Sequence, residues 1–242
     1  MNATKTDPQA FSQEGRQYLL IGSGRVARHL SHYFNLLEIS YKSWDRSQDP
    51  QALQPLIASS THILLAISDG AIEPFYRRYL DGLNKTVIHF SGAHHYTDIM
   101  CAHPLMTFGP ELYDFDFYKK IFFAVTGAAH LRDLLPFANP WSVLDATSKP
   151  LYHALCVVGG NFSTLLINQM LLGFSDLQIP AHAAQLYLQK NLENAFAHSH
   201  QALTGPLARK DRATVAANLQ ALNGKPALEI YKTFLKIYWP EY

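Results

Sequence analysis

Short apolar runs alternate with amphipathic segments over the first part of the chain. Apolar runs bounded by turn residues are typical of buried strands, whereas apolar residues three and four apart are typical of helices. The strand pattern occurs at 18–21, 39–44, 62–67, 86–90, 121–125 and 141–144. The helical pattern occurs between the first four of these runs, at 28–34, 50–59 and 70–80. The alternation predicts an α/β domain in which helices wrap a parallel sheet.

The pattern changes at Lys149-Pro150. Beyond this point helical periodicity continues without a convincing strand, and glycine and proline residues separate the helical segments. These segments are 151–174, 181–200, 214–222 and 226–238. We therefore predict a sheet domain over 16–148 and an all-helical domain over 149–242. Residues 1–15 are polar and unpatterned, which predicts a flexible tail.

The composition excludes several classes of protein. The chain of 242 residues has a net charge of +1 and no basic run, so we expect no nucleic-acid partner. Two distant cysteines favour a reducing, cytoplasmic setting. No stretch approaches membrane-spanning length, so we expect no membrane segment. The histidines lack metal-ligand spacing, and no metal site is predicted; the groups considered are His94, His95, Cys101 and His103, and His198 with His200.

The first apolar run leads directly into a glycine turn and a helix. The turn has the spacing G-x-G-x-x-A, which is a fingerprint of dinucleotide binding. The first glycine permits the tight turn, the second lets a pyrophosphate approach the backbone, and the alanine lets the helix pack on the strand. Unpaired N–H groups at the helix start face the phosphates. The cofactor-binding residues predicted here are Gly22, Ser23, Gly24, Arg25 and Val26.

The end of the second strand normally distinguishes NAD from NADP. An acidic residue there holds the ribose 2′-hydroxyl, whereas an arginine with a hydroxyl residue accommodates a 2′-phosphate. This chain offers both, with Asp45 followed by Arg46 and Ser47. A guanidinium and a hydroxyl directed at a dianion outweigh one carboxylate that can turn away. We therefore predict NADP as the cofactor and keep NAD as the alternative.

Two further strands end in polar residues at the same edge of the predicted sheet. Ser68 and Asp69 follow the third strand, and Ser91 and Gly92 follow the fourth. Ligands of doubly wound sheets bind at the carboxyl ends of the strands, so all four residues are predicted to contact the cofactor. In the alternative interpretation, Asp69 is only the N-cap of the next helix.

Further motifs follow the glycine turn in a fixed order. They are LAISDGAI at 65–72, HFSGA at 89–93, AHPLMTF at 102–108, YHA at 152–154, NF at 161–162 and LTGPLARKD at 203–211. Together these resemble a family of uncharacterised Rossmann-like proteins regarded as NADP oxidoreductases, whose helical C-terminal half is a domain of unknown function. That family is related to pyrroline-5-carboxylate reductase, 6-phosphogluconate dehydrogenase and deazaflavin-dependent NADP reductases.

The resemblance implies a Rossmann domain followed by a helical domain of the 6-phosphogluconate dehydrogenase C-terminal type. It also implies a cleft between the domains and a homodimer through the helical domain. Two positions depart from the family pattern. Lys210 stands where the family usually has glycine, and Gly159-Gly160 precedes Asn161 where less flexible residues are usual.

Related dehydrogenases carry a general acid and an orienting amide on the first helix of the second domain, which assigns catalysis here to His153 and Asn161. The two residues are eight apart, so on a regular α-helix they share roughly one face. Histidine can supply a proton near neutral pH. In the alternative interpretation, both side chains only make structural hydrogen bonds.

Four polar residues are predicted to contact the substrate: His103, Thr204, Arg209 and Asp211. We interpret His103 as a loop position beside a proline. Arg209 can clamp a carboxylate through two hydrogen bonds. Asp211 can equally cap the helix that follows it, with Arg209 as its ion-pair partner.

The sequence thus predicts an NAD(P)-dependent oxidoreductase that transfers a hydride to or from a small C=O or C=N substrate. One alternative is a non-catalytic NADP-binding sensor or regulatory protein. Another is an S-adenosylmethionine-dependent methyltransferase, which also has a glycine turn after its first strand.

Overall fold

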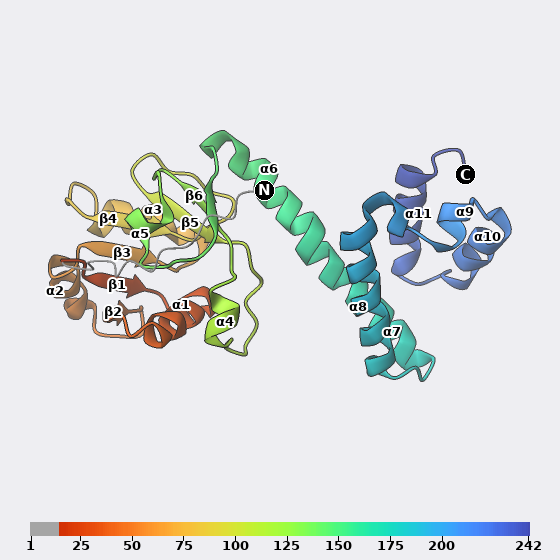
Figure 1. The fold of residues 1–242 in the computed structure, drawn as a ribbon, viewed down its shortest axis with the longest axis horizontal. Helices are drawn as coiled ribbons and strands as arrows, with labels where there is room; N and C mark the ends of the chain where they lie inside the picture. The colour runs from red at the N-terminus through yellow and green to blue at the C-terminus, as the bar shows by residue number, and fades with distance from the viewer. Residues whose placement is uncertain (1–14) are drawn as a thin grey trace, which may run out of the picture. The chain divides into compact units, whose positions relative to one another are not determined.

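The computed structural model describes residues 15–242, which divide into two compact units (Figure 1). The first unit ends at Gly160 and the second begins at Asn161. The predicted tail over 1–15 lies outside the described residues except for Gly15.

The first unit is built on one seven-stranded sheet with the order β2-β1-β3-β4-β5-β6-β7. Its strands are β1 (Tyr18–Ile21), β2 (Tyr41–Trp44), β3 (His62–Leu65), β4 (Thr86–His89), β5 (Met100–Pro104), β6 (Phe123–Thr126) and β7 (Trp141–Val143). All six predicted strands form. The sheet is parallel, as predicted, except that β6 pairs antiparallel with β5. The strand β5 was not predicted, since a histidine and a proline break its apolar run.

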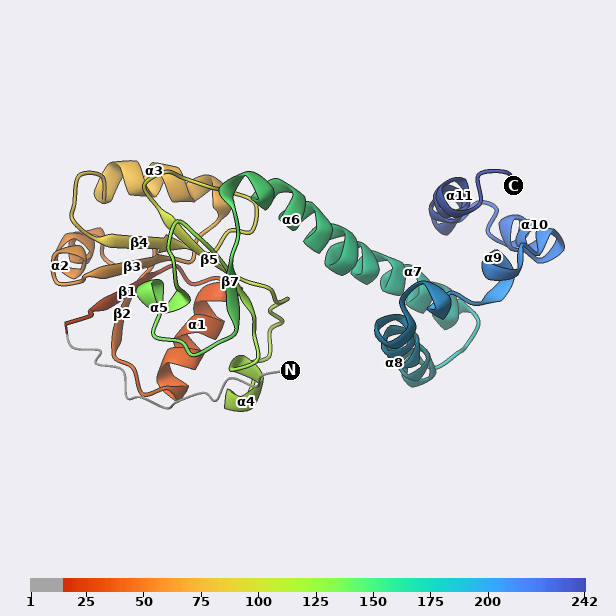
Figure 2. The same ribbon diagram turned by 45° about the horizontal axis from the view of Figure 1, so that its top comes forward.

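Helices cover both faces of this sheet, with α1 and α3 on opposite sides (Figure 2). The helices of the first unit are α1 (Arg25–Leu36), α2 (Leu53–Ala58), α3 (Asp69–Tyr79), α4 (Phe115–Tyr118), α5 (Leu131–Leu134) and α6 (Lys149–Cys156), with the short 3-10 segments η1 (Pro50–Ala52) and η2 (Ala146–Ser148). Side chains of β1 alternate between the faces. Tyr18 and Leu20 pack in the apolar layer under α1, whereas Leu19 and Ile21 pack in the layer under α2 and α3.

The first unit extends past Lys149-Pro150 because α6 is fixed to the sheet. The side chain of Lys149 is 1% exposed and donates hydrogen bonds to Ser91 O and Cys101 Sγ, each over 3.0 Å. Tyr152, one turn further, contacts His103 on β5. The division between the units therefore falls at Gly160 instead of 148.

The helix predicted over 151–174 is interrupted. The segment η3 (Val157–Asn161) is π-helical and separates α6 from α7 (Phe162–Asp176). It contains the glycine pair that departs from the family pattern. Because π-helical hydrogen bonds span five residues, the regular α-helical spacing assumed between His153 and Asn161 does not hold.

The second unit is helical throughout the residues that the structure describes, as predicted. It contains α7, α8 (Ala181–His198), the 3-10 segment η4 (Ser199–Ala202), α9 (Gly205–Arg209), α10 (Arg212–Ala221) and α11 (Ala227–Tyr238). Its small core consists of Val215, Leu235 and Trp239. The helix α9 was not predicted.

The expectation that no segment reaches membrane-spanning length is wrong. Residues Ala146–Asp176 form one helical stretch whose length and composition would suffice to cross a membrane, and none of its most apolar window is buried. Its exposed apolar side chains include Leu155, Leu165 and Leu172. Exposed apolar residues continue along α8, where Phe196 is 85% exposed.

Candidate functional site

The turn after β1 has a backbone that only glycine fits. Gly22 has a φ of +122°, and a Cβ added there would lie 2.3 Å from the carbonyl oxygen of Ala66. Its N–H donates to Trp44 O over 2.9 Å. The turn therefore brings the ends of β1, β2 and β3 together, as the fingerprint predicts.

The helix α1 begins with its N–H groups uncapped. Gly24 is the N-cap residue, and it makes no side-chain cap hydrogen bond. A Cβ added to Gly24 would meet nothing within 4 Å, so the space beside the helix start is open. Ala27 is buried against the sheet, which keeps the helix close to β1. Open N–H groups and the positive end of the helix dipole favour an anion here.

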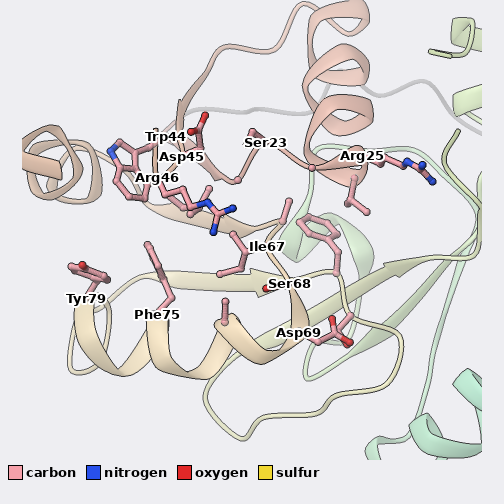
Figure 3. Close-up of a pocket in the computed structure, with 18 residues that line it drawn as sticks. Ser23, Arg25, Trp44, Asp45, Arg46, Ile67, Ser68, Asp69, Phe75 and Tyr79 are labelled. Carbon is pink, nitrogen blue, oxygen red and sulfur yellow. The ribbon is translucent and has the colours of Figure 1, made fainter. Parts of the chain in front are cut away.

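A cavity of about 620 Å³ lies in front of this helix start (Figure 3). Its volume falls within the range of small-molecule and cofactor sites. The lining residues are Ile21–Val26, Trp44–Arg46, Ala66–Asp69, Ala71, Phe75, Tyr79, Phe90 and Ser91. All the predicted cofactor-binding residues line it except Ser47 and Gly92, each of which directly follows a lining residue.

The two charged residues at the end of β2 face different ways. The guanidinium group of Arg46 projects into the space between the glycine turn and α3, whereas the carboxylate of Asp45 points away from it (Figure 3). The Asp45 carboxylate accepts from the N–H of Ser47 over 2.8 Å and from its hydroxyl over 2.6 Å. These two hydrogen bonds lower the pKa of Asp45. The carboxylate is thus engaged within its own turn.

The residues after β3 take places that differ from the prediction. Ser68, not Asp69, is the N-cap of α3, and Asp69 lies in the first turn. The Asp69 carboxylate lies 3.6 Å from Nε2 of His94. The interpretation of Asp69 as a simple N-cap is therefore wrong, because its side chain points toward the loop after β4.

A group of histidines gathers where β4 ends. A Cβ added to Gly92 would lie 2.8 Å from Cδ2 of His153 and 2.9 Å from Nε2 of His103. Both rings therefore lie against the backbone of Gly92. The interpretation of His103 as a loop residue is wrong, since it belongs to β5, but the structure does bring it to the edge that Ser91 shares with the cavity.

Burial and a nearby ammonium group set the charge state of these histidines. Desolvation, followed by the charge of Lys149, lowers the pKa of His103 to about 4 and that of His89 to about 3. His89 is 0% exposed, and its Nδ1 accepts from the N–H of Ser91 over 3.2 Å. Its Nε2 is buried without a hydrogen-bond partner among the described residues. Both rings are therefore neutral at pH 7.

The pair of Tyr152 and His103 could not be found from the sequence. The Tyr152 hydroxyl lies 2.8 Å from Nδ1 of His103. Burial, followed by the neighbouring Cys156, raises the pKa of Tyr152. The motif YHA drew attention to His153, whereas only the contact between α6 and β5 shows that its neighbour reaches the site.

The remaining predicted site residues belong to the second unit: Asn161, Thr204, Arg209 and Asp211. Asp211 is the N-cap of α10 and accepts from the backbone N–H of Thr214 over 3.1 Å, as the alternative interpretation expected. Thr204 is the N-cap position of α9, and Arg209 is that helix's last residue. Roles of these four residues toward a substrate stay predictions.

Comparisons with known proteins agree with this fold. A family model described as a domain of unknown function, DUF2520, matches residues 126–236. A Bacteroides fragilis protein provisionally assigned as an NADP oxidoreductase is similar in structure at 16% identity, with a TM-score of 0.74 over 92% of this chain and 97% of that one.

Two further solved structures share the fold. A Thermotoga maritima protein matches at 18% identity with a TM-score of 0.65, covering 91% of this chain and 96% of that one. An imine reductase from Myxococcus stipitatus in complex with NADP+ matches at 13% identity with a TM-score of 0.61, covering 93% and 91%. Among proteins with curated functions, none matches. The chain therefore has a Rossmann-like sheet followed by a helical region, in the arrangement found in NADP oxidoreductases and imine reductases.

Proposed function

We propose that this chain is an NADPH-dependent oxidoreductase that transfers a hydride between the nicotinamide and a small C=O or C=N substrate. The observation that carries the proposal is the arrangement at the end of β2. Arg46 projects into the cavity, while Ser47 engages the carboxylate that would otherwise hold a ribose 2′-hydroxyl (Figure 3). A guanidinium group is suited to a 2′-phosphate.

The rest of the cavity fits the other parts of the cofactor. The uncapped start of α1 and the open space at Gly24 suit the pyrophosphate. Ser68 and Ser91 line the far part of the cavity, where the ends of β3 and β4 meet. The nicotinamide would supply the hydride there, beside the histidines packed on Gly92.

The test is a titration of the purified chain with NADPH and NADH, followed by nicotinamide fluorescence. We expect NADPH to bind more tightly, and Arg46→Ala to weaken NADPH binding about tenfold or more, as loss of a charge-assisted contact does. Arg77→Ala is the matched control, because Arg77 lies on the same unit but pairs with Asp81 outside the cavity.

Tighter binding of NADH would assign the ribose to Asp45, and displacement of the cofactor by S-adenosylmethionine would favour the methyltransferase alternative. Binding of neither nucleotide would contradict the proposal. NADPH binding without turnover of any carbonyl or imine would favour the sensor alternative.

We also propose that the second unit forms a homodimer. The helix α7 contains no buried residue although most of its residues are apolar, and a helix that is apolar all round is normally buried. Large exposed apolar patches mark interaction surfaces. A second copy is the occupant we favour over a bilayer, because Lys149 ties the start of the apolar stretch to the sheet and Asn161, Asn168 and Gln169 interrupt the remainder. A two-fold axis would pair the same surface with itself.

A further inference from the structure

The two ring nitrogens of His103 have different surroundings. Its Nδ1 contacts the Tyr152 hydroxyl, whereas Nε2 has no hydrogen-bond partner within residues 15–242 and lies against Gly92 at the end of β4. His153 packs on the same glycine but presents the carbon Cδ2. Of the two rings at this edge, His103 is the one that turns a nitrogen toward Gly92.

The tautomer of His103 is fixed if its partner is the donor in their contact. A Tyr152 hydroxyl that donates to Nδ1 leaves that nitrogen of the neutral ring without a proton of its own. The ring proton then sits on Nε2, which becomes a hydrogen-bond donor. A neutral donor at this edge suits an oxygen acceptor.

A second histidine–tyrosine pair in the same unit shows what a structural pair looks like. Nδ1 of His29 lies 2.7 Å from the Tyr118 hydroxyl, and its Nε2 lies 3.0 Å from the carbonyl oxygen of Gly109. Both nitrogens of His29 are therefore used inside the protein. His103 differs because only Nδ1 is used.

The surrounding charge is positive. Lys149 is buried beside Ser91 and Cys101, and no carboxylate lies within ion-pair distance of it in the part of the chain that the structure describes. The carboxylate of Asp69 raises the pKa of His103, but this is the smallest of the influences on that pKa. Asp69 itself lies beside His94. Such a site stabilises developing negative charge and disfavours a bound cation.

We propose that this site takes a neutral ketone or aldehyde, not an iminium ion. In this proposal His103 donates a proton to the carbonyl oxygen, and Tyr152 in turn donates a proton to His103. The inference rests on the proposed oxidoreductase function and narrows its substrate class. The carbonyl carbon accepts the hydride from NADPH, and the oxygen takes the Nε2 proton. Nδ1 takes the Tyr152 proton, and Tyr152 regains one from solvent. The products are the alcohol and NADP+.

The test compares turnover of a panel of small ketones and aldehydes with that of preformed cyclic imines, at saturating NADPH. We expect carbonyl reduction to exceed imine reduction. Tyr152→Phe should lower kcat for carbonyls about tenfold, and His103→Gln should lower it about a hundredfold or more, the lower end of general acid catalysis. Tyr118→Phe, the matched change in the structural pair, should leave kcat near that of the original chain.

A relay also has a signature that a structural hydrogen bond lacks. The solvent deuterium isotope effect on kcat should decrease in Tyr152→Phe, while the Kd of NADPH stays unchanged. Faster reduction of imines than of carbonyls, or an unchanged kcat in Tyr152→Phe, would overturn the inference while leaving the cofactor assignment intact. Absence of NADPH binding would instead remove the proposed function itself.

Discussion

The ammonium group of Lys149 donates to the carbonyl oxygen of Ser91 over 3.0 Å, and this contact joins α6 to the loop that follows β4. A buried ammonium group is costly unless hydrogen bonds compensate it. Here the backbone oxygen of Ser91 and the thiol of Cys101 accept these hydrogen bonds. Among the described residues no carboxylate lies at ion-pair distance from Lys149, so its positive charge acts on the neighbouring histidines without being offset there.

Replacing Lys149 with methionine should raise the pKa of His89 and of His103, because the lysine charge now lowers both. NMR titration of the histidine rings measures this. Lys85→Met is the matched control, since Lys85 also donates to two backbone carbonyls, those of Ala58 and Ser60, but outside the site. Titration curves of His103 that coincide in both variants would contradict the role given to Lys149.

The same two histidines predict a loss of stability in acid. Their folded-state pKa values, about 4 and about 3, lie below the ordinary value of 6.5. Below pH 6.5 the unfolded chain binds protons that the folded chain refuses, so each group lowers the free energy of unfolding by up to about 1.4 kcal/mol per pH unit as the pH falls toward its folded pKa. The contribution is fully present above pH 6.5.

Urea unfolding between pH 7 and pH 4.5 measures this dependence. His103→Gln should make the curve of stability against pH shallower over this range. His198→Gln, at an exposed position on α8, serves as the control. An equally steep curve in His103→Gln would show that other groups cause the loss.

The two glycines of the turn should respond differently to alanine. Gly22→Ala should destabilise the fold by roughly 2 kcal/mol or more, because its φ is +122° and the new Cβ would clash with Ala66 O. Gly24→Ala should fold normally, since nothing lies near its Cβ, yet weaken NADPH binding by occupying the space for the pyrophosphate. Thermal unfolding and NADPH titration of both variants separate the two effects. Normal NADPH affinity in a folded Gly24→Ala would argue against a pyrophosphate at α1.

The sequence was sufficient to predict the strands whose apolar runs are continuous. Strand β3 and the turn at Gly22 depend on local patterns, and both form. Strand β5 cannot be predicted from its pattern, because His103 is polar and Pro104 disfavours strands. Its place in the sheet depends on pairing with β4 and β6. Non-local pairing leaves no periodic signal.

The site was predictable to the same extent. The residues around the cofactor cavity follow strand ends, so topology alone brings Gly24, Arg46 and Ser68 together. The pairing of Tyr152 with His103 depends on how α6 packs on β5, which no spacing in the sequence encodes. The change of pattern at Lys149 predicts only a domain boundary, whereas the burial of its side chain makes Lys149 part of the site's electrostatics.

Lys210, which stands where the family usually has glycine, gives a prediction of its own. It has a φ of +56° at the end of α9, a left-handed conformation that favours glycine. Its side chain pairs with Glu241 over 2.6 Å, but both partners are half-exposed, and such pairs contribute little. Lys210→Gly should therefore stabilise the chain by about 1 kcal/mol through relief of strain. Lys210→Ala loses the ion pair and keeps the backbone strain, so it should not stabilise the chain. Chemical denaturation measures the free energy of unfolding of both variants. A Lys210→Gly variant less stable than the original chain would show that the ion pair outweighs the strain.

The exposed apolar surface of α7 and α8 predicts self-association. Leu172 is 65% exposed and Phe196 is 85% exposed. If a second copy covers them, Leu172→Glu and Phe196→Glu should each convert a dimer to a monomer, because burying an unpaired charge in an interface costs several kcal/mol. Light scattering after size-exclusion chromatography measures the mass.

Phe115→Glu provides the control, because Phe115 is an exposed apolar residue of the first unit and should leave the mass unchanged. A lipid bilayer is the alternative partner for this apolar surface, and vesicle binding tests it. A chain that remains monomeric in detergent-free buffer and cosediments with phosphatidylcholine vesicles would contradict the dimer. A chain that is dimeric without lipid and does not cosediment with vesicles would support the dimer. The exposed side chains of the apolar stretch from Ala146 to Asp176 would then have a protein partner.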